Sequence, residues 1–235
     1  MPAFPKIDAS KNQILAHLPA REAKRLLPHL RFVSLRLKQV LYQPGEPIGD
    51  VYFPHDAVIS MIAPMADGKS VEVTLIGPEG MAGLRAILAG KTYWYVSVVQ
   101  IAGLCLKING KVLEAEFKRC GVLHERLLHY TSYLLAQTSQ LAACNRVHRL
   151  EQRLARWLLT ARDRVKRDQF EMTHEFLSEM LGTPRSEVSR ATGALRKAGL
   201  IRYGRGTLTI LDSEALESVA CECYQVLRQE LYGPR

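Results

Sequence analysis

Charged and hydroxyl side chains gather in one short stretch near the C-terminal end of the chain, GTPRSEVSRATGALRKAGLI (182–201). Arg185, Ser186, Ser189 and Arg190 fall within six positions of this stretch. An arginine can bind a guanine edge or a phosphate through paired hydrogen bonds, and small serines between arginines let a helix come close to a surface. The chemistry that this spacing favours is recognition of a nucleic acid.

The same stretch has the period of an amphipathic helix. Val188, Ala191 and Leu195 are spaced by three and four residues, so they share one face and are expected to be buried. Lys197 is expected to lie outward with the arginines and serines.

The residues before this helix have the pattern of a shorter helix and a tight turn. THEFLSEML (173–181) is predicted to be helical with Thr173 as its N-cap, and Gly182 permits a sharp turn. Thr183 is predicted to cap the next helix, with Pro184 in its first turn, where a missing N–H costs no hydrogen bond. The order helix, tight turn, helix is that of DNA-reading modules.

A basic hairpin follows the second helix. Residues 200–203 and 207–211 are strand-like and flank Arg205, which lies between two glycines. Helix-turn-helix plus such a wing predicts that double-stranded DNA is a partner, with the second helix in a major groove.

A long helix is predicted over 121–146, and its leucines form two adjacent stripes of period seven. These stripes consist of Leu127, Leu134 and Leu141, and of Leu128, Leu135 and Ala142. One stripe could pack on the same subunit and the other on a second copy, which predicts a homodimer. The alternative is a helix buried inside one subunit.

A further helix is predicted over 147–166, with one apolar stripe and arginine-rich outer faces. The stripe consists of Val147, Leu150, Leu154, Trp157, Leu158, Ala161 and Val165. The arginines assigned to the outer faces include Arg156 and Arg164.

The N-terminal half has two different patterns. Residues 10–30 show helical spacing interrupted by Pro19, and 31–108 show short apolar segments separated by turn compositions. The expected fold class is α+β: an N-terminal antiparallel β-roll, a long dimerisation helix and a C-terminal winged helix-turn-helix. The expected boundaries are 1–120 for the sensor roll, 121–146 for the helix and 147–235 for the DNA-binding domain.

Composition is consistent with these expectations. The 235 residues are 47% hydrophobic and carry a formal charge of +9, which favours an anionic partner. The five cysteines are scattered without paired spacing, which argues against a disulfide framework or a zinc site and for a reducing compartment. The sequence has neither a signal-peptide pattern nor an apolar run of the roughly 18 residues that cross a membrane. A cytoplasmic protein with no membrane partner is expected.

Two segments resemble the Crp/Fnr superfamily of bacterial regulators. KQVLYQPGEPIGDVYF (38–53) is similar to the early strands of its cyclic-nucleotide-binding roll, and residues 172–212 are similar to its winged helix. The resemblance implies dimers that pair along the long helix, transcription control at a two-fold-related DNA site, and RNA polymerase as a partner.

The resemblance carries over unevenly to single residues. Arg185 and Arg190 match the ends of the superfamily's R-E-x-x-x-R stretch, but Ser186 stands where the glutamate is usual, so a different operator is expected. Ser189 matches the serine of the oxygen-regulator branch. His174 matches a position that holds phosphate in the cyclic AMP branch.

The effector cassette departs further from the pattern. Gly83 matches its glycine, but Leu84 follows where a ribose-binding glutamate is usual, and residues 93–97 lack the phosphate-binding arginine. Tight binding of cyclic AMP or cyclic GMP is therefore not expected, and the effector is unknown.

Other residues of a possible effector pocket have two interpretations. Tyr93 and Tyr95 could line an apolar cavity or fill the roll's core. Thr138 and Ser139 match a base-binding pair, but without a phosphate clamp they are interpreted as polar residues of the dimer helix.

No cofactor is expected. The N-terminal region lacks the grouped cysteines of an iron–sulfur cluster, and no motif selects His55 or Cys105 as a haem ligand. Cys221 and Cys223 are interpreted as core residues of a final helix, so no metal site is expected.

These observations favour a homodimeric DNA-binding transcription regulator. The alternative is a sensor that acts through protein contacts without operator binding. A cupin-like enzyme on the roll would need clustered histidines, but the seven histidines are dispersed and no catalytic residues are identified.

Overall fold

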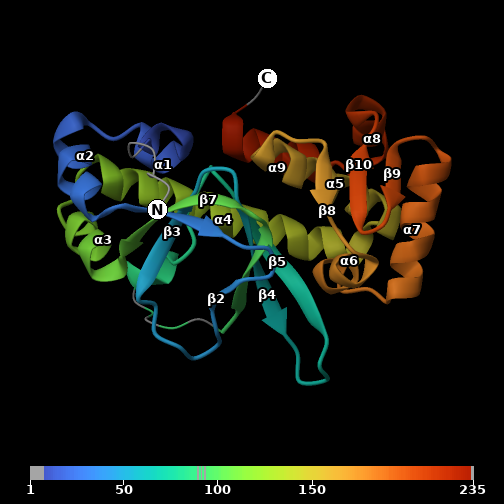
Figure 1. Cartoon of the computed structure of the whole chain (residues 1–235), viewed down its shortest axis with the longest axis horizontal. Coiled ribbons are helices and arrows are strands. Elements are labelled where there is room, and N and C mark those ends of the chain that lie inside the picture. The colour runs from blue at the N-terminus through green and yellow to red at the C-terminus, as the bar shows by residue number, and fades with distance from the viewer. Residues whose placement is uncertain (1–7, 89, 91, 93, 234–235) are drawn as a thin grey trace. The chain divides into compact units, whose positions relative to one another are not determined.

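The computed structural model describes residues 8–88, 90, 92 and 94–233, so Tyr93 lies outside the described residues. The chain forms two compact units. One comprises residues up to Met61 together with Leu75–Leu134, and the other comprises Ile62–Thr74 and Leu135–Arg235. Figure 1 shows the order of the elements along the chain.

Seven strands build the roll predicted for the N-terminal half. They are β1 (Arg31–Leu35), β2 (Val40–Tyr42), β3 (Asp50–Pro54), β4 (Val58–Pro64), β5 (Ser70–Ile76), β6 (Val96–Ile101) and β7 (Gly103–Asn109). One sheet has the order β1-β7-β3 and the other β2-β6-β4-β5. β7 pairs antiparallel with β1 and β3, and β2 pairs antiparallel with β6.

Side chains from both sheets form one core between them. Its buried members are Leu35, Tyr42, Ala57, Ile59, Ile76, Ala82, Val99 and Cys105. The β-branched and aromatic residues of these short segments suit a pleated surface that is buried on one side. Their burial provides the roll with a hydrophobic core.

Helices flank the roll in the sequence: α1 (Gln13–Ala16), α2 (Ala20–Leu26), α3 (Gly110–Phe117) and α4 (Val122–Val147). Pro19 separates α1 from α2, as predicted. Glu22 of α2 caps the long helix, because its carboxylate accepts from Val122 N at 3.0 Å and Leu123 N at 2.9 Å. A carboxylate there satisfies free amides and complements the positive end of the helix dipole.

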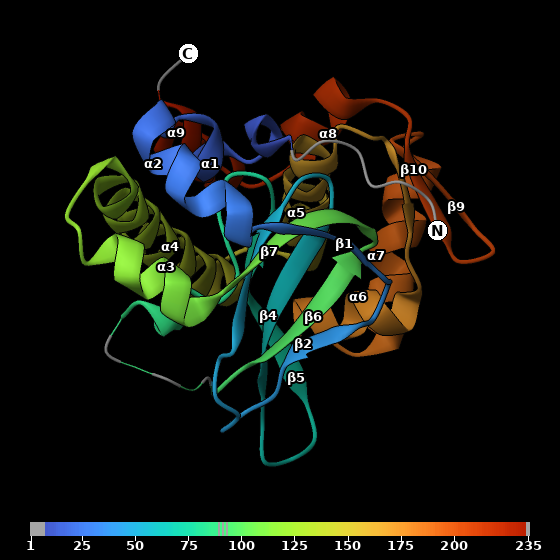
Figure 2. The ribbon, with the colours of Figure 1, turned by 60° about the vertical axis from the view of Figure 1, so that its left-hand side comes forward.

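The second unit contains the predicted helix-turn-helix and wing. Its helices are α5 (Leu150–Val165), α6 (His174–Leu181), α7 (Arg185–Lys197), α8 (Ser213–Val219) and α9 (Cys223–Tyr232). The wing strands are β9 (Ile201–Gly204) and β10 (Thr207–Ile210), and Figure 2 shows them beside α7. A third strand, β8 (Gln169–Glu171), pairs with β10 and was not predicted, because three residues are too short for a period-two pattern.

α5 is buried on more sides than predicted. Leu154 and Trp157 are buried as expected, but Val147 is 72% exposed and precedes the helix. Arg156 and Arg164 are buried, although the sequence placed them on solvated faces. The reason is that α6, α7, α8 and α9 all pack against α5, so little of its surface is left for water.

The tip of the β4–β5 hairpin belongs to this second unit. Glu72 is buried and accepts a hydrogen bond from Trp157 Nε1 of α5 at 3.0 Å. Thr74 Oγ1 donates to Gln137 Oε1 of α4 at 2.5 Å. A segment of the predicted sensor roll therefore packs with the helices of the second unit.

Within the described part of the chain, no helix combines the length and the apolar character needed to cross a bilayer.

Candidate nucleic-acid interface

The turn between α6 and α7 has the chemistry expected of it. Thr173 caps α6 by accepting from Phe176 N at 3.1 Å, and Gly182 ends that helix in the left-handed region at φ 59°. The predicted cap of α7 is wrong by one residue. Pro184 is the N-cap, with an extended ψ of 143°, and the Thr183 hydroxyl donates instead to Leu181 O at 3.2 Å.

The inward face of α7 is the predicted one. Val188 and Ala191 are fully buried and Leu195 is 3% exposed. This apolar face anchors α7 to α5 and α6. It fixes which side of α7 remains at the surface.

The outward face of α7 carries the predicted polar and basic residues. Arg185, Ser186, Ser189, Arg190 and Lys197 are all exposed. The Arg190 guanidinium pairs with Glu187, and Arg185 Nη1 lies 4.0 Å from Glu175 Oε1. Exposed pairs of this kind contribute only about 0–1 kcal/mol, so both guanidinium groups can exchange these carboxylates for an anionic ligand.

His174 joins the two helices of the motif. Its Nδ1 lies 3.0 Å from Ser189 Oγ and its Nε2 lies 3.0 Å from Thr192 Oγ1. The ring also stacks on Tyr203 of the wing, with the centroids 4.3 Å apart. Burial lowers the pKa of His174, and the nearby charge of Arg185 lowers it further. The imidazole is therefore neutral near pH 7 and occupied by internal partners.

The wing presents a basic tip. Arg205 is exposed and adopts φ 52° between β9 and β10, followed by Gly206 at φ 76°. Residues other than glycine rarely adopt a positive φ. At this turn, the positive φ values of Arg205 and Gly206 reverse the chain direction so that β10 can pair with β9.

The two leucine stripes of α4 have different surroundings. Leu127 is fully buried and Leu141 is 6% exposed, whereas Leu128 is 46% exposed and Leu135 66% exposed. Ala142 continues the exposed stripe. One stripe therefore packs within the chain, and the other leaves a row of apolar side chains at the surface.

The candidate effector residues are divided between the units. Gly83 and Leu84 are buried in the first unit, where Gly83 has φ 102°, and a Cβ there would lie 2.5 Å from Val51 Cγ1. Tyr95 is half-buried and packs against the roll's core. Thr138 and Ser139 are exposed on α4 in the second unit.

The two residues considered as haem ligands are core residues. His55 is 6% exposed and meets Phe32 edge-on, with the ring centroids 5.1 Å apart. Burial lowers the pKa of His55 and raises the pKa of the Cys105 thiol.

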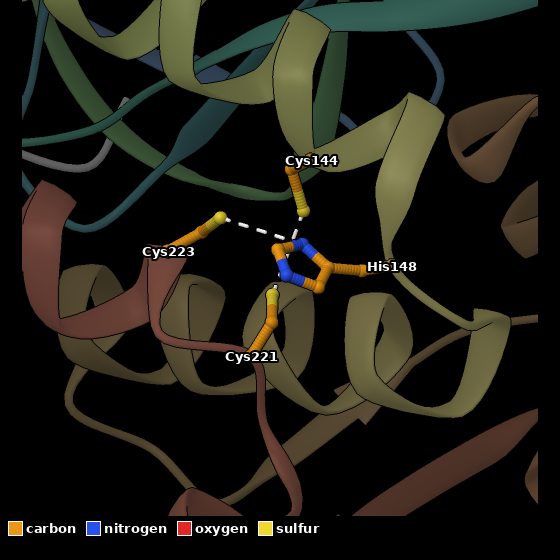
Figure 3. Close-up of side chains that lie close together, drawn as sticks. All are labelled: Cys144, His148, Cys221 and Cys223. Atoms are coloured by element: carbon orange, nitrogen blue, oxygen red, sulfur yellow. Dashed lines mark hydrogen bonds between the residues drawn. The ribbon is translucent and has the colours of Figure 1, made fainter.

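A second group of reactive side chains was missed by the sequence pattern. Cys144, His148, Cys221 and Cys223 converge in the second unit, as Figure 3 shows. The prediction of one final helix is wrong, because α8 and α9 are separate and Cys221 lies in the turn between them. The residues form two local pairs, Cys144 with His148 and Cys221 with Cys223, which are more than seventy positions apart, and only the fold brings the two pairs together.

Two family models match separate parts of the chain. The cyclic nucleotide-binding domain matches residues 32–120, and the Crp-like helix-turn-helix domain matches residues 152–219. The first covers the roll and the second covers α6, α7 and the wing.

Similar proteins share this arrangement over most of the chain. The global nitrogen regulator of Synechocystis sp. is 22% identical over 219 residues, which cover 88% of this chain and 96% of that protein. A transcriptional regulator of the Crp/Fnr family from Eubacterium rectale matches with a TM-score of 0.69 at 16% identity, covering 89% of this chain and 98% of that one. FixK2 from Bradyrhizobium japonicum matches with a TM-score of 0.68 at 17% identity, covering 82% and 98%.

Proposed function

Because this chain belongs to the Crp/Fnr superfamily of DNA-binding transcription regulators, we propose that it acts as a homodimer in which each subunit places α7 in a major groove. It is a regulator and not an enzyme. The observation that carries the proposal is the outward face of α7, where two arginines and two serines stay exposed while the opposite face is buried.

The roles of the α7 residues follow from their chemistry. Arg185 and Arg190 reach base edges, since a guanidinium binds guanine through two parallel hydrogen bonds. Ser186 and Ser189 keep the helix surface low, so the backbone can approach the groove. Lys197 lies at the far end of the helix and binds phosphate.

The remaining predicted contacts support this helix. Arg205 at the wing tip binds the phosphate backbone beside the groove. Thr183 contributes from the turn before α7. His174 organises the motif instead of holding phosphate, because Ser189 and Thr192 already occupy its two nitrogens.

The exposed stripe of α4 supports the homodimer. Leu128 and Leu135 are seven residues apart and lie at the surface, which is the spacing of a coiled-coil seam. A symmetric pair of α4 helices would cover them, and the two α7 helices would read half-sites about 34–36 Å apart.

The sensor roll does not bind cyclic AMP or cyclic GMP tightly in this proposal. The residue after Gly83 is a buried leucine instead of a carboxylate, and 93–97 contain no arginine. A different signal, carried through the β4–β5 hairpin to α4 and α5, re-aims α7. Activity then depends on RNA polymerase in the cytoplasm.

Selection of genomic DNA fragments by the purified full-length chain tests the proposal. Fragments recovered should share a two-fold-related sequence, and fluorescence anisotropy with that sequence should show affinity that falls steeply as salt increases. Arg36→Ala, an exposed change on the roll, is the control and should leave affinity unchanged. Recovery of no preferred sequence would support the alternative, a sensor that acts only through protein contacts.

A further inference from the structure

Three cysteines and one histidine surround a single point in the second unit. Cys144 lies in the last turn of α4, and His148 lies just after it. Cys221 lies in the turn before α9, and Cys223 is the first residue of α9. The three thiols are buried and His148 is half-buried. A hydrogen bond from His148 N to Cys144 O at 3.1 Å continues the helical turn, so both side chains point to the same side.

The separations among these side chains match those of ligands to one ion. Cys144 Sγ lies 3.5 Å from Cys221 Sγ, and Cys223 Sγ lies 3.6 Å from His148 Nδ1. All four ligand atoms lie within 4.8 Å of one another. Ligands at the corners of a tetrahedron around Zn²⁺, with Zn–S near 2.3 Å and Zn–N near 2.0 Å, are separated by about 3.5–3.8 Å.

The groups around the cluster orient it for metal binding. Glu222 Oε1 lies 3.1 Å from His148 Nε2, so a proton on Nε2 is donated to this carboxylate and the Nδ1 lone pair faces the sulfurs. Gln140 Nε2 donates to Cys223 Sγ at 3.0 Å. A carboxylate behind a ligand histidine and an amide N–H on a ligand sulfur are typical of the groups that support bound metals.

A buried positive charge acts on the cluster, because the guanidinium of Arg156 interacts electrostatically with Cys144. Arg156 is 4% exposed, and a buried cation balances the negative charge that three thiolates and one divalent ion leave. If all four side chains were neutral core residues, the buried guanidinium of Arg156 would have no negative charge in this cluster to balance it.

We propose that Cys144, His148, Cys221 and Cys223 bind one zinc ion in a closed tetrahedral site. Sulfur and imidazole ligands select a soft or borderline ion, and zinc is the common choice for three cysteines and one histidine. Four protein ligands leave no position for a substrate, so the ion is structural. It ties the start of α9 to the junction between α4 and α5.

Two other uses of the cluster fit the geometry less well. A disulfide between Cys144 and Cys221 would leave Cys223 and His148, with their own hydrogen-bonding partners, without a role. An iron–sulfur cluster places several atoms between its ligands, which would then lie farther apart than ligands of a single ion.

Metal analysis of the full-length chain, purified under reducing conditions, tests the proposal. The protein should contain about one zinc per chain, and Cys221→Ser and Cys223→Ser should lower this at least about tenfold. Cys120→Ser is the matched control, because this thiol is exposed and outside the cluster, and it should retain the zinc. Cobalt in place of zinc should give thiolate-to-metal absorption typical of a tetrahedral site in the control but not in the two variants.

A second measurement covers variants that fold poorly. Glu222→Gln keeps all four ligands and should bind zinc about tenfold more weakly, measured by competition with a chelating dye. Zinc added back to the chelator-treated native chain should raise its melting temperature. The proposal is overturned by a chain that binds no zinc, by equal zinc in the cysteine variants, by a mass two hydrogens lighter from a disulfide, or by iron with acid-labile sulfide.

Discussion

Arg190 forms an ion pair with Glu187 on the exposed face of α7, and Arg185 lies near Glu175. Both carboxylates face water, so these pairs contribute little to folding. In the proposed function, a stronger partner, such as a guanine edge with its neighbouring phosphates, replaces these carboxylates. Both arginines are exposed on a helix whose opposite face is buried.

Removing either arginine should weaken specific binding. Arg185→Ala and Arg190→Ala are each expected to cost about 1–3 kcal/mol at the selected DNA sequence, because a bidentate base contact is lost. Fluorescence anisotropy on the specific and on a scrambled sequence measures the change, with Arg36→Ala as the control. If both variants bind the specific sequence as tightly as the native chain, these arginines do not read bases.

The histidine of the motif should titrate below its ordinary range. Burial lowers the pKa of His174, so the unfolded chain binds a proton at a higher pH than the folded chain. The contribution of the neutral ring to stability should therefore be fully present above about pH 6.5 and be lost as the pH falls through the folded-state pKa. NMR titration of the ring and unfolding of the native chain against His174→Asn at several pH values measure this.

The same experiment separates two roles for His174. DNA affinity should show no gain from His174 between pH 7.5 and 6 if the residue organises Ser189 and Thr192. A midpoint above about 6.5, with DNA affinity rising as the ring is protonated, would instead indicate a direct phosphate contact.

The outward residues of α7 could be predicted from spacing alone, because helical period decides which side chains share a face. The partners of His174 could not be predicted, since Ser189, Thr192 and Tyr203 meet it only through the turn and the wing. The cysteine cluster was missed for a related reason. Cys144 and His148 are separated from Cys221 by more than seventy positions, and no local pattern in the sequence can show that such distant residues lie close together in the fold.

At the scale of whole elements, α4 is the clearest candidate for an assembly surface. Leu127 and Leu141 of its first stripe are buried, and its second stripe lies at the surface with Leu128 and Leu135 exposed. The sequence predicted both stripes but could not decide which one faces the protein. That choice depends on contacts with residues distant in sequence within each unit, which local spacing does not define.

Charges on this stripe should separate the subunits. Leu128→Glu and Leu135→Glu each remove a leucine whose burial in the interface would stabilise the dimer by about 1.5–3 kcal/mol. Because the dimer has two-fold symmetry, the leucine is lost from both subunits and the loss of free energy is doubled. The dimer dissociation constant should rise roughly hundredfold or more, measured by sedimentation equilibrium. Leu104→Glu, the same change at an exposed position on the roll, should leave the dimer intact. Dissociation in that control, or an unaffected dimer in both α4 variants, would place the interface elsewhere.

The elements that could be predicted are those whose apolar pattern extends over several residues. The roll, α4, α6, α7 and the hairpin of the wing all follow apolar patterns of several residues. β8 and the break between α8 and α9 did not, because a three-residue strand and a short turn carry too few side chains to define a period. The buried arginines of α5 escaped prediction because helices from several parts of the chain cover them.

At the scale of the whole molecule, we propose that the roll is not a cyclic nucleotide sensor, because residues 93–97 contain no phosphate-binding arginine. Calorimetric titration of the full-length chain with cyclic AMP should show no saturable heat at micromolar concentrations, because charge-assisted contacts to the phosphate supply much of such recognition. Cyclic GMP should behave in the same way. Saturable micromolar binding of either nucleotide would mean that another group, such as Arg85, replaces the missing clamp.

A consequence for protein engineering follows from the hairpin tip between β4 and β5. Val71 lies against Gly182, because a Cβ built on the glycine would lie 3.0 Å from Val71 Cγ2. Glu72 accepts a hydrogen bond from Trp157, and Thr74 donates one to Gln137. A hybrid that grafts this DNA-reading half onto a foreign sensor would have to import residues 62–74 as well. Otherwise two buried polar groups would lose their partners, at about 1–3 kcal/mol each. Excising that half intact therefore takes three cuts in the chain, not one.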